Sequence, residues 1–169
     1  MLELELNKTD DAGAVSGVTA TLENVNLRTE KSGPDKIPAI DMKLSCAQNA
    51  DVLANFSPTL KNFLFEVSVD LAGDVMAVRD SHLGYPLSRD EEMSGAKVSI
   101  GYGPGAPMLF DDCKVNAFKL TPMEGGTVIL GFRVQCRASP EQVARLYELL
   151  ERGIELTIEP AELPEMKAA

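Results

Sequence analysis

The sequence predicts a single α+β domain in which two helical segments pack on a bent antiparallel sheet of about seven strands. Residues 127–137 alternate apolar and polar side chains, which is the period of a half-buried strand. Residues 139–142, Ser-Pro-Glu-Gln, read as a capping box and so begin the clearest helix. The sheet is expected to be barrel-like or else a sandwich.

Residues 109–137 are expected to form one long hairpin that turns at residues 122–126, where two glycines allow positive φ. In the first arm the apolar phase changes between Val115 and Phe118, which predicts a β-bulge near Ala117. The expected inward pairs are Phe118 with Leu130 and Val115 with Phe132.

The other elements follow from the same periodicities, taken in order. Alternation predicts strands over residues 2–7, 18–27 (with a bulge near Glu23 and Asn24), 40–46, 65–69, 97–102 and 154–158. Three-to-four spacing predicts a short helical turn and a second helix within residues 50–64, with Ser57 as N-cap, and a helix from Ser139 that stops at Gly153. Residues 72–96 show no period and are predicted to be an irregular loop. The domain is expected to span residues 1–159, with an acidic, proline-containing tail over 160–169.

Composition limits the class of protein and its compartment. The net charge of −10 opposes indiscriminate binding to nucleic acid, although a local basic patch is compatible with it. The three cysteines fall at apolar strand positions, which favours reduced core residues over a disulfide. The first residues lack the pattern of a signal peptide, and no apolar run reaches the ~18 residues of a membrane span. We therefore expect a cytoplasmic protein that does not enter membranes.

Catalytic and metal-binding patterns are weak throughout the sequence. The single histidine, His82, has no neighbouring nucleophile or ligand set. Asp111 and Asp112 are adjacent on a predicted strand, so their side chains are expected to point to opposite faces, whereas a hard cation needs convergent oxygens. The sequence therefore predicts a protein that is not an enzyme and has no catalytic residues, no metal and no cofactor.

Basic side chains concentrate on the outward positions of the predicted strands. Acidic residues are expected mainly in the 72–96 loop, the last helix and the tail. Outward cations on a sheet curled by bulges resemble the barrel of an oligonucleotide-binding (OB) fold, which usually offers exposed aromatics as base-stacking platforms. The nucleic-acid-binding candidates are Lys43, Lys114, Lys119, Arg133, Arg137 and the aromatic Tyr102. The alternative is an ordinary solvated face on which lysines protect sheet edges.

The predicted loop holds a second candidate site, for a protein partner. It offers an apolar and aromatic cluster beside the histidine on irregular backbone. These partner-binding candidates are His82, Leu83, Tyr85 and Leu87. The alternative is that Tyr85 and Leu87 pin the loop to the core.

Three segments carry a resemblance to a known group of proteins. They are the bulged strand 22–28, the Asn-Phe-Ser-Pro-Thr-Leu segment 55–60, and the stretch from Asp112-Cys113-Lys114-Val115 to Gly125-Gly126-Thr127-Val128. With them the chain resembles uncharacterised early-region proteins of tailed bacteriophages and prophages, over most of residues 15–158. The resemblance implies a place among replication, recombination or anti-defence proteins, and a partner rather than a substrate.

Three functions follow as expectations. The first is a non-catalytic binding protein that holds single-stranded DNA across the basic hairpin faces. The second is an anti-defence or host-takeover inhibitor that binds a host protein, with its acidic surface as a nucleic-acid mimic. The third is an assembly component that forms a homo-oligomeric ring.

Overall fold

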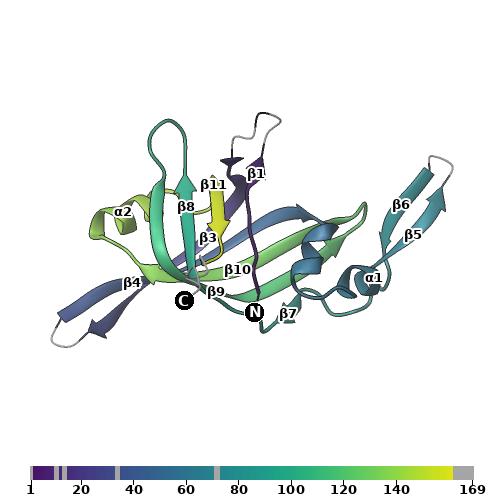
Figure 1. Ribbon diagram of the computed structural model, residues 1–169, viewed down its shortest axis with the longest axis horizontal. Coiled ribbons are helices and arrows are strands. Elements are labelled where there is room, and N and C mark those ends of the chain that lie inside the picture. The colour runs from purple at the N-terminus through teal and green to yellow at the C-terminus, as the bar shows by residue number, and fades with distance from the viewer. Residues whose placement is uncertain (1, 10–11, 13–14, 33–34, 71–72, 162–169) are drawn as a thin grey trace, which may run out of the picture.

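A computed structural model describes residues 2–9, 12, 15–32, 35–70 and 73–161 (Figure 1). Side chains are described over fewer residues, because those of 8–9, 15, 30–37, 70 and 73–74 are left out. The elements are β1 (Lys8–Thr9), β2 (Val15–Ser16), β3 (Val18–Ser32), β4 (Asp35–Asn49), the 3-10 helix η1 (Ala50–Asn55), α1 (Leu60–Leu64), β5 (Phe65–Asp70), β6 (Gly73–Val78), β7 (Leu87–Arg89), β8 (Met93–Gly101), β9 (Met108–Met123), β10 (Thr127–Arg137), α2 (Pro140–Glu148) and β11 (Gly153–Glu159).

The main sheet has seven strands in the order β10-β4-β3-β11-β8-β9-β7, and every pairing is antiparallel. A further pairing of β9 with β10 closes the sheet into a ring. Because β7 pairs only with β9, six of the seven strands make the ring. The prediction of a bent, barrel-like antiparallel sheet of about seven strands with helical segments is thus confirmed. An OB-fold has five strands, so the strand number differs from that form.

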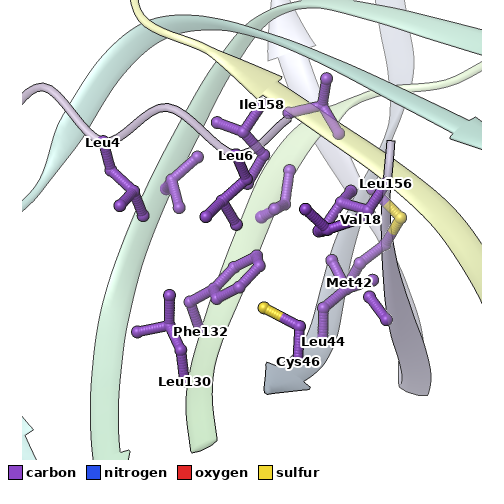
Figure 2. Packing of buried hydrophobic residues seen from close by; sticks show 14 of the residues in the cluster. Leu4, Leu6, Val18, Met42, Leu44, Cys46, Leu130, Phe132, Leu156 and Ile158 are labelled. Atoms are coloured by element: carbon purple, nitrogen blue, oxygen red, sulfur yellow. The ribbon is translucent and has the colours of Figure 1, made fainter. Parts of the chain in front are cut away.

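The core fills the inside of the ring. Alternate residues of β10 are buried, including Leu130 and Phe132, while their neighbours face outward. Figure 2 shows these two side chains close to Leu4 and Leu6 of the N-terminal segment, which are also buried. The predicted strand over residues 2–7 is wrong as a regular strand, because among them only Leu6 pairs, in an isolated bridge to Ile158. Its alternating leucines nevertheless contribute to the core as expected.

Both predicted bulges are present. The register of β3 on β4 shifts between Leu22 and Asn24, and that of β10 on β9 shifts between Gly131 and Arg133. In the second bulge Ala117 adopts a positive φ of 54°, which adds one residue to β9 and changes its phase. The predicted inward pairs are wrong, because the bulge lies opposite Phe132. The observed pairs are Leu130 with Leu120 and Val134 with Val115.

The helix α2 begins as predicted, with Ser139 accepting from the Gln142 backbone and Gln142 closing the capping box. It ends at Glu148 rather than at Gly153, which is the first residue of β11. The expected Ser57 cap is also displaced, since α1 begins at Leu60 with Thr59 as its N-cap. The two helical segments are therefore where the periodicity placed them, with shorter bounds.

The prediction that residues 72–96 form an irregular loop is wrong for most of that range. It contains β6, β7 and the first four residues of β8. Among the described strands β6 pairs only with β5, and the two make an arm that projects at one end of the molecule, opposite the end reached by the β3–β4 hairpin (Figure 1). Gly125, in the turn after β9, donates to Met76 of this arm at 2.8 Å. Apolar residues occupy both faces of β6, which hid its period, and β7 has only three residues. The tail beyond Ala161 lies outside the described residues.

The three cysteines are buried and unpaired, as predicted. Burial raises the pKa of the Cys46 thiol to about 11, and a hydrogen bond with Cys113 together with burial raises the pKa of the Cys136 thiol. A raised pKa keeps the Cys46 and Cys136 thiols protonated at pH 8, and burial shields all three thiols from a reagent in solution. We expect the folded protein to resist Ellman's reagent at pH 8 and to show three reactive thiols per chain in urea. Rapid reaction of the folded chain would contradict this placement.

Candidate nucleic-acid interface

Five of the six nucleic-acid-binding candidates lie together on the outer face of the ring. They come from neighbouring strands, β4, β10 and β9, and all five are exposed. Arg133 stands directly opposite Lys43 on β4, and Lys119 stands opposite Gly131, two residues from Arg133. Lys114 and Arg137 lie farther along the same two strands. These five cations define what we call the basic face: Lys43, Lys114, Lys119, Arg133 and Arg137.

The bulge at Ala117 is the reason that the lysines of β9 share a face. Lys114 and Lys119 are an odd number of residues apart, so in a regular strand their side chains would point to opposite faces. The extra residue at the bulge restores the phase, and both lysines are exposed while Phe118 is buried. A local backbone irregularity therefore creates this part of the basic face.

A chain of hydrogen bonds crosses the basic face, centred on Asn116. This nearly buried side chain accepts from Arg133 Nε at 3.0 Å and donates to Gln135 and to Glu92, both at 3.2 Å. Gln135 donates in turn to Asp41 Oδ1 at 3.1 Å, which also accepts from Arg28 Nε at 2.7 Å. The network links β3, β4, β10 and β9 and fixes the position of Arg133.

Carboxylates accompany some of the cations. Lys114 lies 3.4 Å from Glu92, and Lys43 lies 3.8 Å from Glu23, the residue inserted by the bulge in β3. The hydrogen bond from Asn116 holds the pKa of Glu92 below its usual range, opposed by desolvation and aided by the charges of Lys114 and Arg133. Glu92 is therefore ionised at neutral pH and reduces the positive potential beside Lys114.

The face is hollowed in two places. A hollow of about 270 Å³ lies over Gly131 and is lined by Lys43, Lys119 and Arg133, together with Asp41 and two asparagines of β3. A larger hollow of about 600 Å³ is lined by Arg28, Lys114 and Arg137, and by both Asp111 and Asp112. The first is lined by three cations and one carboxylate, and the second by three cations and two carboxylates.

The expectation that Asp111 and Asp112 point to opposite faces is wrong. Both are exposed and line the same hollow, because Asp112 adopts a positive φ of 53° at a further register irregularity of β9. Nothing in the sequence signalled that irregularity. Within the described part of the chain, no group of three or more His, Cys, Asp or Glu residues is placed to hold a metal ion.

Tyr102 is not brought together with the basic face. It follows β8 and lines a separate hollow with Thr19, Ile154 and Glu155, on the β3–β11–β8 side of the ring. Arg152 lies 5.9 Å over its ring centroid. The stacking platform expected of Tyr102 would therefore be remote from Lys119 and Arg133.

The partner-binding candidates of the predicted loop are mostly packed inward. Leu83, Tyr85 and Leu87 are half-buried and contact the core, and only His82 is exposed. Leu87 begins β7, which pairs with β9 opposite Leu120. This packing corresponds to the alternative reading, in which these residues pin the segment to the core. Their role in docking stays a prediction.

Comparison with known proteins places the chain in no family. No family model matches it. No solved structure matches it either. The chain is 29% identical over 146 residues to a cobyrinate a,c-diamide synthase of Magnetococcus marinus, a match that covers 80% of this chain and 31% of that protein. The chain thus spans about a third of the length of this curated relative. Among the described residues, no helix is long and apolar enough to cross a membrane.

Sequence reasoning missed three residues that shape the interface. Asn116 gave no signal because its partners Glu92 and Gln135 are distant in the sequence, and Gly131 read as an ordinary outward position. Glu92 was assigned to a loop, whereas it lies against Asn116 and Lys114. The glycine was the clue that could have been followed, since a glycine inside a strand marks a close approach or a bulge.

Replacing Glu92 with glutamine is expected to increase affinity for an anionic ligand roughly threefold, because it removes a negative charge beside Lys114 and Arg133. The glutamine oxygen can still accept from Asn116, so the network is kept. The check is a comparison of dissociation constants for an oligonucleotide, with Glu148→Gln on α2 as the matched charge change far from the face. An equal gain in both variants would show an effect of net charge alone.

Proposed function

We propose that the protein binds single-stranded DNA without catalysis, through the basic face of the ring. The observation that carries the proposal is the convergence of Lys43, Lys119 and Arg133, from three strands, around one hollow. Phosphate contacts supply most of the affinity of sequence-independent binding. Aromatic platforms are few in this chain, at 5% of residues, so the phosphates rather than the bases are expected to carry the binding.

The arrangement of charges on the basic face favours the one sugar-phosphate backbone of single-stranded DNA over the two backbones of a duplex. Carboxylates border the cations on both sides, with Glu23 beside Lys43 toward β3 and Glu92 beside Lys114 on β9. A narrow cationic path of this kind fits the single phosphate chain of a strand, whereas a duplex presents two chains to the flanking carboxylates. The proposal places the protein in the cytoplasm with the replication or recombination proteins of a tailed phage or prophage, as the sequence resemblance implies.

The test is fluorescence anisotropy with a labelled thymidine oligonucleotide and a duplex of equal length, at 50 and 200 mM salt. Three phosphate contacts at a slope of about 0.7 each predict a loss of affinity on the order of twentyfold over this range. The single strand should bind more tightly than the duplex. Absence of binding at 50 mM salt, or binding that is indifferent to salt, would refute the proposal.

A second candidate function, the inhibition of a host protein, is favoured by the β5–β6 arm. Val67 and Val69 on this arm are 64% and 84% exposed, and among the described strands β5 pairs only with β6, whose other edge is contacted by Glu124 and Gly125. Unpaired edges and exposed β-branched residues are the features by which a partner can add a strand. Val67→Lys with Val69→Lys should abolish retention of a purified host partner and leave the DNA affinity unchanged. Retention by the double variant would remove this alternative.

A further inference from the structure

The hollow over Gly131 is lined by three cations and one carboxylate, and this lining allows the proposed function to be stated more precisely. We propose that it is the seat of a single phosphate group, held by Lys43, Lys119 and Arg133. In bound DNA this would be one phosphate of the strand, and to that extent the inference rests on the proposed function. Free phosphate compounds share the same chemistry, so the experiment below separates the two sources.

The three cations are available to a ligand to different degrees. The Lys119 side chain has no hydrogen bond or ion pair with any described residue, and the Lys43 side chain has only the loose contact of 3.8 Å with Glu23. Arg133 is held at Nε by Asn116, and no described residue occupies its two terminal nitrogens. An arginine fixed in this way presents two donor nitrogens without losing further side-chain freedom, which suits recognition of a phosphate.

The carboxylate in the hollow does not cancel these charges. Asp41 also lines the hollow, but its Oδ1 accepts hydrogen bonds from Arg28 at 2.7 Å and from Gln135 at 3.1 Å. Arg28 therefore balances the charge of Asp41 from the neighbouring strand β3. The cations that remain beside Gly131 outnumber the carboxylate.

The size of the hollow fits one group rather than a whole ligand. Its volume of about 270 Å³ lies below the ~300–1,000 Å³ of pockets that enclose a drug-sized molecule. The space exists because residue 131 lacks a side chain. A Cβ at this position would meet Lys119 and Leu44 atoms at 3.8 to 3.9 Å, which is ordinary contact, and its φ is not positive. A larger residue could therefore occupy the seat without straining the backbone.

Gly131→Val tests the seat directly. Valine favours strands, so the melting temperature should stay the same or rise, while the affinity for the thymidine oligonucleotide should fall about tenfold because the side chain fills the phosphate position. Thr127→Val is the control, since it places the same side chain outward on the same strand and should leave the affinity unchanged. If Gly131→Val folds and binds the strand as tightly as the parent chain, the seat is refuted and the proposed function stands.

A second measurement keeps the seat testable apart from DNA. Titration of the ¹⁵N-labelled chain with pyrophosphate should shift the Gly131 amide in the parent and leave residue 131 unshifted in Gly131→Val. If the parent shows this shift but does not bind the oligonucleotide, the seat serves a free phosphate compound and the proposed function fails. If neither pyrophosphate nor the strand affects residue 131, the seat is refuted.

Discussion

Replacing Phe118 with alanine is expected to lower the free energy of unfolding by about 3–5 kcal/mol, the cost of a large cavity in a packed core. Phe118 is fully buried next to the bulge. Its ring contacts Phe56 edge-on, with centroids 5.1 Å apart, and Phe132 at 6.1 Å. Phe118 on β9 therefore links Phe56, the residue after η1, to Phe132 on β10. Its loss should weaken both the attachment of η1 and the packing inside the ring.

Urea denaturation followed by circular dichroism measures this effect. The control is Phe63→Ala, because Phe63 on α1 is 58% exposed and its truncation should cost far less. Equal losses for the two variants would mean that Phe118 does not hold the ring and the helical segment together.

Reversing two charges of the basic face should have the largest effect on binding. The double variant Lys119→Glu with Arg133→Glu is expected to reduce the affinity for single-stranded DNA on the order of a hundredfold, because two phosphate contacts become repulsive. The oligonucleotide anisotropy titration at 50 mM salt measures it, and the melting temperature confirms that the chain remains folded.

The control for this experiment is Lys61→Glu with Lys97→Glu. It changes the net charge by the same amount, but it does so on α1 and on β8, and neither lysine lines the hollow over Gly131. A small loss in the control and a large one on the face would locate binding at Lys119 and Arg133. A loss of equal size in both would show that overall charge governs the affinity.

The sequence was most informative where the period of two is regular. The strands of the long hairpin, both bulges and the cap of α2 were predictable, because each depends on neighbouring residues alone. The bulge near Ala117 also predicted that Lys114 and Lys119 share a face, which is the basis of the candidate site. The resemblance to phage early-region proteins and the binding of DNA stay predictions.

The features that the sequence did not predict depend on contacts between residues far apart in the chain, and a local pattern carries no information about such contacts. The position of Glu92 against Asn116 is an example, since it arises from a segment that carries no period. The predicted separation of charges is correspondingly incomplete, because Glu23, Asp41 and Glu92 lie among the cations. Tyr102 failed to join the face because its place around the ring depends on the strand order.

The dependence of affinity on salt, measured side by side for the parent chain and for Lys119→Ala, tests most directly whether this surface neutralises phosphates. Plotting the logarithm of the binding constant against that of the salt concentration counts the contacts. If Lys119 contacts a phosphate, the slope for the variant should be shallower by about 0.7. Parallel lines for the two proteins would contradict the account.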